Sequence, residues 1–340
     1  KADIATREPL KTTSSFNLAS VSKQFIAMMV MMLEEKGKLH YDDPVKQYLP
    51  AFPYETITIR HLLTHTSGLP EYFDLVLAHR NTLDTLTNTK LVQLLAEFKP
   101  KPNFAPGERW EYCNTGYVLL ASVIEKAANM PVESFFKQQI TDPLGLRNTY
   151  IYTLEMKQSP PGRVFGFRRE NGREVSSDLM RFDGVVGDGN IYSSVDDLLK
   201  WDQALYTEKL VSAKSMKPAF TPVKLNNTQT HNYGFGWFVD STGQVVSHTG
   251  SWVGFLNEIV RDTKKQQTVI VLSSGSDAVA RNCVKAILAG KKPGIPHLEL
   301  ITNIQLIDGT GSPARVCSVR LRDNKIWETG DLTPLPGESV

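Results

Sequence analysis

Residues 20–36 constrain the fold of this chain more than any other segment, because their helical pattern is apolar nearly all round. The apolar positions are Phe25, Ile26, Met28, Met29, Val30, Met31 and Leu33. A helix without a polar face is buried among other elements. Gly37 ends the pattern, as glycine often does after a helix. The run from Phe25 to Leu33 is shorter than the ~18 apolar residues that span a bilayer, so we expect no transmembrane segment.

The other periodicities predict an α+β fold. Helical patterns broken by proline and glycine fill residues 41–180, including one over 115–129, and a further helix is expected near 195–205. Strand-like runs follow at 233–239, 255–261 and 268–273, and then a helix near 278–288. We therefore expect an antiparallel sheet domain flanked by helices, formed by residues 1–40 and 181–290, with an all-helical insertion domain at 41–180.

Composition and charge exclude several kinds of partner. The net charge is +2 and no stripe of basic residues is present, which argues against nucleic-acid binding. The three cysteines form neither a disulfide framework nor a metal-binding pattern, and the seven histidines are not clustered at ligand spacing. We therefore expect no metal site, no cofactor and no nucleic-acid partner.

Ser20 and Lys23 are the first candidate catalytic residues. They form an S-x-x-K pattern, which recurs at Ser134 and Lys137. Ser20 stands at the start of the buried helix, whereas Ser134 lies within an ordinary amphipathic stretch. At a helix start, Ser20 and Lys23 share one face and lie at the positive end of the helix dipole, where a neutral amine can activate a serine. The alternative is a serine that caps the helix and a lysine that faces solvent.

Tyr112 and Asn114 form the only Y-x-N in the chain, in a loop that precedes the 115–129 helix. From there Tyr112 can relay a proton to a leaving group, and Asn114 can bind a substrate amide and Lys23. A packed tyrosine and an asparagine that caps the helix would account equally well for the same residues.

A third candidate element is His248-Thr249-Gly250, the only H-x-G in the chain. A glycine at this place lets a substrate approach the edge of a strand. The N–H of Ser251 would then form an oxyanion hole together with the N–H of Ser20. On its own, the triplet is better explained by a histidine in a turn.

Taken together, the three elements and the sequence around them resemble the serine β-lactamase and penicillin-binding protein family, in which S-x-x-K carries the nucleophile. The resemblance covers roughly residues 1–290 and is specific to the class-C-like branch. It includes the segments Ile57–Pro70, Phe104–Gly107, Pro143–Leu146, Gly189–Ser193 and Tyr233–Trp237. It implies the β-lactamase/transpeptidase-like composite fold, with the site in the cleft between the sheet and the helical domain.

The resemblance also implies a role for each candidate residue. Ser20 would be acylated, Lys23 would activate it, Tyr112 would act as base and acid, and Asn114 would contact the substrate and Lys23. His248 stands where β-lactamases and carboxypeptidases carry a lysine, and His-x-Gly is similar to the D-aminopeptidase and esterase members. Because histidine is mostly neutral at pH 7, this exchange weakens the case for a substrate carboxylate.

We therefore predict a serine hydrolase that forms a Ser20 acyl-enzyme and cleaves amide or ester bonds of small substrates, with D-amino-acid derivatives as the best candidates. The alternatives are a β-lactamase or DD-carboxypeptidase, and a penicillin-binding protein that acylates without efficient turnover. A scaffold with an idle site would not need the whole set of candidate residues. The expected partner is a small molecule or short peptide, and the resemblance favours a bacterial periplasmic or secreted location.

Residues 297–340 are foreign to this family and follow a linker at 291–296 that is rich in proline and glycine. Alternating apolar positions and the turns Asp308-Gly309 and Asp323-Asn324 predict a small C-terminal β segment. The sequence of this segment resembles the N-terminal β-module of amidohydrolases, notably N-acyl-D-amino-acid deacylases. This resemblance implies a fusion of two hydrolases. The alternative is a tail that completes the sheet, because only residues 2–5 remain of the family's opening β-hairpin. In either case, we expect it to contribute no catalytic residue and no metal ligand.

Overall fold

The computed structural model describes residues 2–3, 8–79, 85–154, 156, 159–170, 173–275, 284, 299–306, 315–322 and 325–330. The described helices are η1 (Ala19–Ser22), α1 (Lys23–Glu35), α2 (Val45–Tyr48), α3 (Ile59–Leu63), α4 (Tyr72–Ala78), α5 (Asn88–Phe98), α6 (Asn114–Ala128), α7 (Val132–Phe136), η3 (Lys137–Thr141), α8 (Asp142–Leu144), α9 (Val195–Ala204), α10 (Ala213–Met216) and η4 (Lys217–Phe220). The described strands are β1 (Phe16–Asn17), β2 (Tyr150–Ile151), β3 (Phe167–Glu170), β4 (Arg173–Ser176), β5 (Ile191–Ser193), β6 (Val223–Lys224), β7 (Thr230–His231), β8 (Phe238–Val239), β9 (Val245–Trp252), β10 (Phe255–Asp262), β11 (Gln267–Ser274), β12 (Glu299–Leu306), β13 (Arg315–Arg322) and β14 (Lys325–Gly330).

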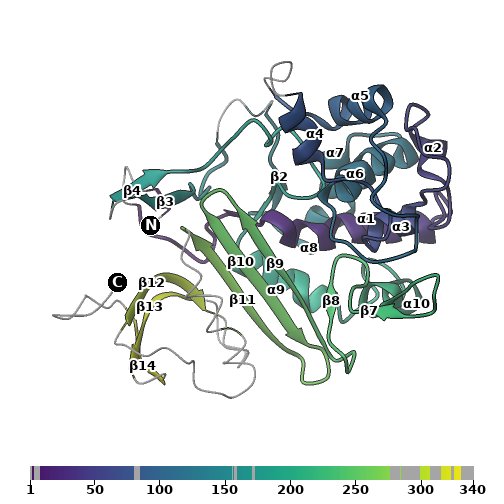
Figure 1. The fold of residues 1–340 in the computed structure, drawn as a ribbon. Coiled ribbons are helices and arrows are strands. Elements are labelled where there is room, and N and C mark those ends of the chain that lie inside the picture. Colours follow the sequence, from purple (N-terminus) through teal and green to yellow (C-terminus); the bar gives the residue numbers. More distant parts are fainter. Residues whose placement is uncertain are drawn as a thin grey trace.

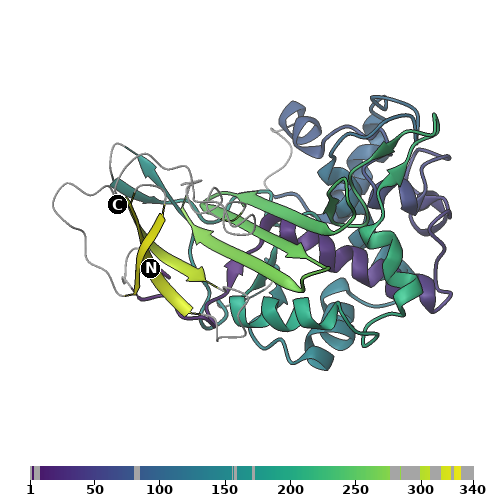
Figure 2. The ribbon, with the colours of Figure 1, turned by 90° about the horizontal axis from the view of Figure 1, so that it is seen from below.

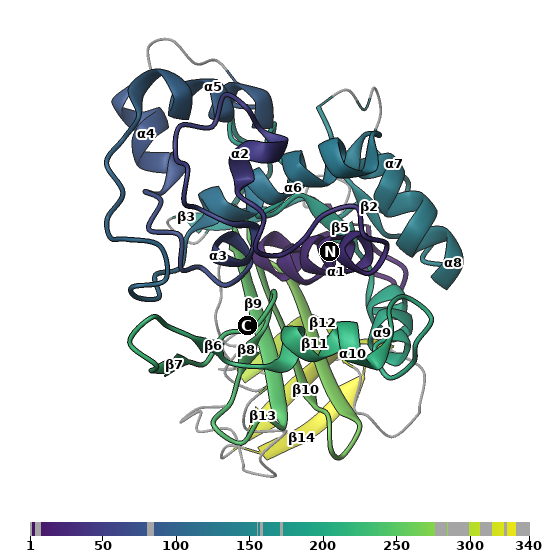
Figure 3. The same ribbon diagram turned by 90° about the vertical axis from the view of Figure 1, so that its right-hand side faces the viewer.

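An antiparallel sheet and a group of helices lie on opposite sides of α1 (Figures 1 and 3). The sheet has the strand order β11-β10-β9-β8, and a smaller sheet, β1-β5-β2, joins segments from three parts of the chain. The helices α2 to α7 form the other part, with α6 packed against α1 and α3. This arrangement confirms the predicted α+β, β-lactamase/transpeptidase-like fold.

The central helix is buried as its composition predicts. All residues of α1 from Lys23 to Leu33 are buried, and the apolar ones from Phe25 to Leu33 form one core together with those of α6. The helical pattern expected at 20–36 is divided, because residues 19–22 form the tight helical turn η1 and the α-helix begins at Lys23. After α1, Gly37 has φ 63°, a left-handed conformation that glycine adopts without steric cost.

The helix α9 contacts both α1 and the main sheet (Figure 2). The indole N–H of Trp201 donates to Oε1 of Gln24 at 2.7 Å, which links α9 to α1. On the other side, Asp202 forms a buried ion pair with Arg261 of β10 and accepts a hydrogen bond from Thr268 of β11. A buried carboxylate needs such partners, so α9 is held at a fixed position against the sheet.

The strands differ from expectation at two places. The run at 233–239 is a strand only at β8, because Gly236 has φ 77° and its backbone packs against Gln24 of α1. In contrast, β9 lies outside the strand-like runs expected from the sequence, and His248-Thr249-Gly250 lies inside this strand rather than in a turn. Regular pairing of β9 with β10 over its whole length explains the difference.

Residues 41–180 are not entirely helical as expected. The described helices of this range end at α8, and β2, β3 and β4 follow it, with β2 paired to β5 of the smaller sheet. The division of the chain into domains therefore remains a prediction. The helix expected near 278–288 and the linker at 291–296 lie outside the described residues, apart from residue 284.

The C-terminal segment contains the expected antiparallel strands (Figure 2). The strands β12, β13 and β14 form a separate sheet in that order, and β12 lies close to β11 of the main sheet. The two turns expected at 308–309 and 323–324 lie outside the described residues. The segment is therefore still predicted to be either a fused module or a tail that completes the sheet.

Candidate active site

Ser20 and Lys23 lie together where η1 passes into α1. The Nζ atom of Lys23 is 3.0 Å from Oγ of Ser20, and the Lys23 side chain is completely buried. The turn before Ser20 is held by Asn17, whose Oδ1 accepts the N–H of Ala19 at 2.8 Å. Ala19 has φ 49°, a left-handed conformation that strains a residue with a Cβ. Such local strain next to a reactive side chain is common at functional sites.

Two further oxygen atoms fix the Lys23 amine. Oδ1 of Asn114 and the backbone carbonyl of Asp188 each accept a hydrogen bond from Nζ at 2.8 Å. Asn114 is the first residue of α6, and Asp188 lies in the Gly-rich turn before β5, so three distant segments converge on one amine. The structure thus brings Asn114 into contact with Lys23, as the sequence suggests.

Glu71 supports this arrangement, although the sequence analysis did not single it out. Its carboxylate accepts hydrogen bonds from the backbone N–H of Asn114 at 3.1 and 3.0 Å, from the Asn114 amide at 2.9 Å and from the N–H of Thr115 at 3.3 Å. A carboxylate at the N-terminus of α6 satisfies free N–H groups and interacts well with the helix dipole. Burial raises the pKa of Glu71, and the bonds to Asn114 oppose this effect.

The Tyr112 ring lies near the Lys23 amine and near the rings of His65 and His248. Nζ of Lys23 is 5.0 Å from the centroid of the Tyr112 ring, and the His65 ring packs on Tyr112 with centroids 4.3 Å apart. Nδ1 of His65 accepts the N–H of Cys113 at 3.1 Å, which fixes the backbone next to Tyr112. Burial and then the charge of Lys23 lower the pKa of His65 well below its usual value. His65 therefore supports Tyr112 as a neutral ring.

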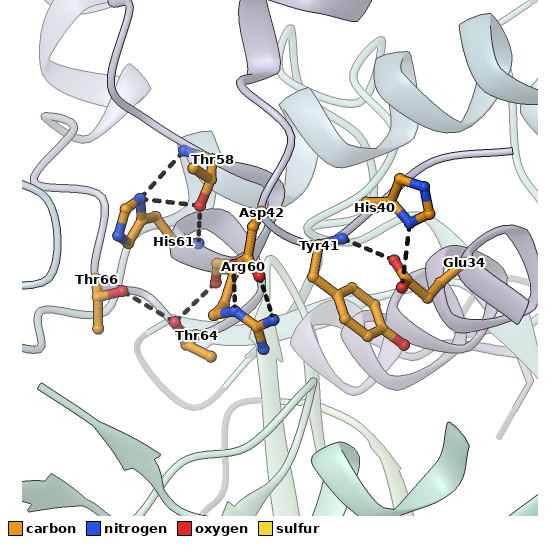
Figure 4. Close-up of polar contacts among 9 residues, drawn as sticks. All are labelled: Glu34, His40, Tyr41, Asp42, Thr58, Arg60, His61, Thr64 and Thr66. Carbon is orange, nitrogen blue, oxygen red and sulfur yellow. Dashed lines mark hydrogen bonds and ion pairs between the residues drawn. The ribbon is translucent and has the colours of Figure 1, made fainter. Parts of the chain in front are cut away.

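The segment that carries His65 is anchored by polar contacts around α3 (Figure 4). Thr58 and His61 form a capping box at the start of the helix. The Arg60 guanidinium binds both carboxylate oxygens of Asp42 at 2.7 and 2.9 Å, and its carbonyl accepts the hydroxyl of Thr64. Thr64 in turn contacts the hydroxyl of Thr66, so the residues on both sides of His65 are tied together. The contacts hold His65 in its left-handed conformation with φ 57°.

His248 is buried rather than exposed to solvent. Its side chain is 1% exposed, its Nε2 is 3.0 Å from the Tyr233 hydroxyl, and its Nδ1 is 2.7 Å from the carbonyl of Thr249. Because a carbonyl can only accept, Nδ1 carries the hydrogen and Nε2 accepts from Tyr233. Burial, and then the charge of Lys23, lower the pKa of His248 to about 3. His248 is therefore uncharged at neutral pH.

Gly250 allows β9 to lie directly against the segment that carries Ser20. A Cβ at this position would lie 2.1 Å from the carbonyl oxygen of Leu18, so no other residue fits without displacing the strand. The space next to Gly250 is thus filled by the chain before Ser20, not by a substrate. This close approach sets Ser251, which follows in β9, beside Ser20.

A pocket opens beside the nucleophile. Ser20, Asn114 and Ser251 line it, together with residues of α4 and of the turn at 182–190. Tyr112, His248 and Thr249 are not among its lining residues, although the Thr249 side chain is exposed on β9. The pocket is therefore formed by Ser20 together with α4, the turn at 182–190 and the end of β9.

Glu71, His65 and Asp188 are not among the site residues predicted from the sequence. Glu71 directly follows the segment Ile57–Pro70, which contains His65, and Asp188 directly precedes Gly189–Ser193, so the quoted segments lie around the missed residues. Within the described part of the chain, no cluster of three or more His, Cys, Asp or Glu side chains is arranged to hold a metal ion. Nor does any helix described here combine the length and apolar character that a membrane span requires.

Comparison with known proteins agrees with this geometry. The chain is 40% identical over 288 residues to "Penicillin-binding protein 4*" of Bacillus subtilis, covering 80% of this chain and 63% of that protein. It is 25% identical over 309 residues to a D-aminopeptidase of Cereibacter sphaeroides, covering 86% of this chain and 57% of that protein. The chain thus spans less than two thirds of the length of either relative.

A solved penicillin-binding protein from Bacillus halodurans superposes with a TM-score of 0.74 at 25% identity, covering 85% of this chain and 89% of that one. Residues 1–291 match the Beta-lactamase family, a range that contains every residue of the site described above. The chain belongs to the Beta-lactamase family.

Proposed function

We propose that this chain is a serine hydrolase, in which Ser20 forms an acyl-enzyme during cleavage of an amide or ester bond in a small substrate. The observation that carries the proposal is the contact of 3.0 Å between Oγ of Ser20 and the buried Nζ of Lys23. A serine needs a neighbouring base to become a nucleophile, and the Lys23 amine is in hydrogen-bond contact with it.

The contacts of Lys23 suit both protonation states that catalysis requires. As an ammonium group, it donates its three hydrogens to Ser20, Asn114 and Asp188. As a neutral amine, it keeps its two hydrogens on the carbonyl oxygens of Asn114 and Asp188, and its lone pair faces Ser20. Lys23 can therefore accept the Ser20 proton without any rearrangement of its partners, which is the preorganisation expected of a general base.

The remaining steps use Tyr112 and two backbone groups. Oγ of Ser20 attacks the substrate carbonyl carbon while its proton passes to Lys23. The N–H groups of Ser20 and Ser251 stabilise the oxyanion. Tyr112, whose ring lies beside the Lys23 amine, delivers a proton to the leaving group, and a water molecule later cleaves the acyl-enzyme by the reverse sequence.

The neutral state of His248 supports a substrate without a carboxylate on the leaving-group side. Its pKa of about 3 means that it offers no positive charge at pH 7. A D-amino-acid amide, peptide or small ester needs no such charge, and one relative is a D-aminopeptidase. The second candidate is a penicillin-binding protein that acylates without efficient turnover, which the 40% identity to a penicillin-binding relative favours. The bacterial relatives also support a periplasmic or secreted location, which fractionation of the source cells would test.

The test compares Ser20→Ala with Ser134→Ala, the serine of the second S-x-x-K, which lies on α7. Each protein is treated with a fluorophosphonate probe and with D-aminoacyl nitroanilides, p-nitrophenyl esters and a chromogenic cephalosporin. Ser20→Ala should lose labelling and, by about 10⁴-fold or more, turnover, whereas Ser134→Ala should keep both. Full labelling of Ser20→Ala would contradict the proposal, and a burst without steady turnover would favour the second candidate.

A further inference from the structure

Glu71 joins two helices beside the nucleophile without lining the pocket. It directly precedes α4, and its carboxylate accepts the backbone N–H groups of Asn114 and Thr115 at the start of α6. Ser20 and Asn114 line the pocket, whereas Glu71 is not among the described lining residues. Any effect of Glu71 on catalysis must therefore pass through another residue.

The Asn114 side-chain amide is held at both ends. Its oxygen Oδ1 accepts a hydrogen bond from Nζ of Lys23 at 2.8 Å, and its nitrogen Nδ2 donates one to Oε2 of Glu71 at 2.9 Å. The two ends differ chemically, because the oxygen only accepts hydrogen bonds and the nitrogen only donates them. A half-turn about χ2 exchanges the two ends with little change of shape, so the partners of Asn114 decide which end faces Lys23.

An ionised carboxylate permits only one of these two orientations. It has no hydrogen to donate, so only the amide nitrogen of Asn114 can face Glu71, and the amide oxygen must face Lys23. In the reverse orientation, the amide nitrogen would point a hydrogen at Nζ of Lys23. It would then repel the ammonium form and occupy the lone pair of the neutral amine, which is needed to accept the proton of Ser20.

The charges around Lys23 act in the same direction. Burial raises the pKa of Glu71 and the carboxylate of Asp188 adds to this rise, whereas hydrogen bonds from Asn114 and the charge of Lys23 oppose it. Glu71 and Lys23 thus interact favourably, with the Asn114 amide between them. Hydrogen bonds in a row polarise one another, so an ionised Glu71 makes the Asn114 oxygen a stronger acceptor for Lys23.

We propose that Glu71 is a positioning residue for catalysis: its carboxylate binds the Asn114 amide nitrogen, directs the amide oxygen to Lys23 and thereby keeps the Lys23 lone pair free for Ser20. This inference rests on the proposed function and adds to it a residue that acts through Asn114. The simpler alternative is that Glu71 only caps α6 through the two backbone N–H groups, which requires no particular orientation of the Asn114 amide.

The first experiment measures how fast a fluorophosphonate probe labels Ser20, because this reaction needs an activated serine but no turnover. Glu71→Met removes both acceptor oxygens and should lower the maximal labelling rate constant by about 10–100-fold. The probe concentration that gives half of this rate should not change, because Glu71 does not line the pocket. In an Asn114→Ala background, Glu71→Met should change the rate constant by less than about twofold.

This double-variant comparison separates positioning from capping. Asn114→Ala keeps the backbone N–H of residue 114, so a cap by Glu71 would remain and its loss would have the same effect in both backgrounds. Asp74→Asn, which removes a charge from the exposed side of α4, and Thr87→Ala, which removes the cap of α5, should leave the labelling rate unchanged. The Tm of each variant records the loss of stability. Equal losses in both backgrounds, or no loss in either, would overturn the inference.

A second pair of variants leaves Glu71 unchanged and does not depend on whether its replacement folds. Asn114→Asp has an oxygen at both ends of the side chain, so an oxygen faces Lys23 in either orientation, while the carboxyl groups at positions 71 and 114 share a proton. Its labelling rate constant, at the optimal pH of each variant, should exceed that of Asn114→Ala by at least about tenfold. Equal rate constants would overturn the inference alone. Failure of the probe to label Ser20 in the wild type would overturn the proposed function and this inference with it.

Discussion

Replacement of Asp183 by asparagine tests whether the buried, ionised carboxylate lowers the free energy of unfolding. Asp183 is almost completely buried, and among the described residues its carboxylate oxygens meet only the N–H groups of Trp252 and Met180. Burial raises the pKa of Asp183 from 3.8 to about 6, and these two hydrogen bonds oppose the change. The folded protein therefore binds this proton more tightly than the unfolded chain.

The direction and size of the effect follow from the two pKa values. The ionised Asp183 carboxylate lowers the free energy of unfolding. This destabilisation is absent below about pH 3.8, grows as the pH rises towards about 6, and is constant above that range. At about 1.4 kcal/mol for each pKa unit, it approaches about 3 kcal/mol at neutral pH. Roughly 2 kcal/mol of this penalty develops between about pH 4.5 and about pH 7.5.

The assay is urea unfolding of the wild type and of Asp183→Asn at these two pH values. The variant should gain about 2 kcal/mol relative to the wild type on going from the lower to the higher pH. The hydrogen bond lost to Met180 is absent at both pH values, so it cancels from this comparison. Asp183→Ser should show the same pH-dependent gain although its stability at either pH differs. A stability difference that does not change with pH would refute the reasoning.

Three further predictions concern catalysis, specificity and the C-terminal segment. Lys23→Ala and Tyr112→Phe should each reduce kcat by about 10²–10⁴-fold. The two losses should not multiply in the double variant, because both residues take part in the same proton transfer. Multiplicative losses would show that they act in independent steps. His248→Lys should raise the activity on substrates with a carboxylate in the leaving group relative to neutral esters, and an unchanged ratio would mean that residue 248 is beyond the reach of the substrate. A chain that ends at residue 290 should keep its Tm and turnover if the segment is a separate module, whereas unfolding of this chain would contradict the fusion hypothesis.

The elements that the sequence predicts well are those with a strong local pattern. The apolar residues of α1 leave no polar face, so its burial follows from composition alone. The strand β9 is absent from the expected strand-like runs because His248-Thr249-Gly250 contains small and polar residues, and it forms by pairing with β10. For Gly250, the sequence suggested room for a substrate, whereas the structure places the carbonyl of Leu18 there.

The parts of the site that the sequence did not reveal depend on contacts between distant segments. Nothing in the sequence around Glu71 indicates that its carboxylate caps α6, whose first residue lies 43 positions later. Asp183 looks like an ordinary loop aspartate until its hydrogen bond to Trp252, 69 positions away, places it in the pocket wall. Such residues have no periodicity of their own, so a single sequence offers no signal that separates them from solvated acids.

The charges near Ser20 bear on the class of substrate. Position 248 holds a buried histidine with a pKa of about 3, so this residue offers no positive charge to a substrate carboxylate at pH 7. Asp183 and Asp188 line the pocket beside Ser20, and burial raises the pKa of both carboxyl groups. The charge of Lys23 opposes this effect at Asp188, whereas hydrogen bonds from Met180 and Trp252 oppose it at Asp183. A substrate carboxylate in this pocket would add a further negative charge without a free cation among the described lining residues to pair with it, so both observations favour a substrate without one.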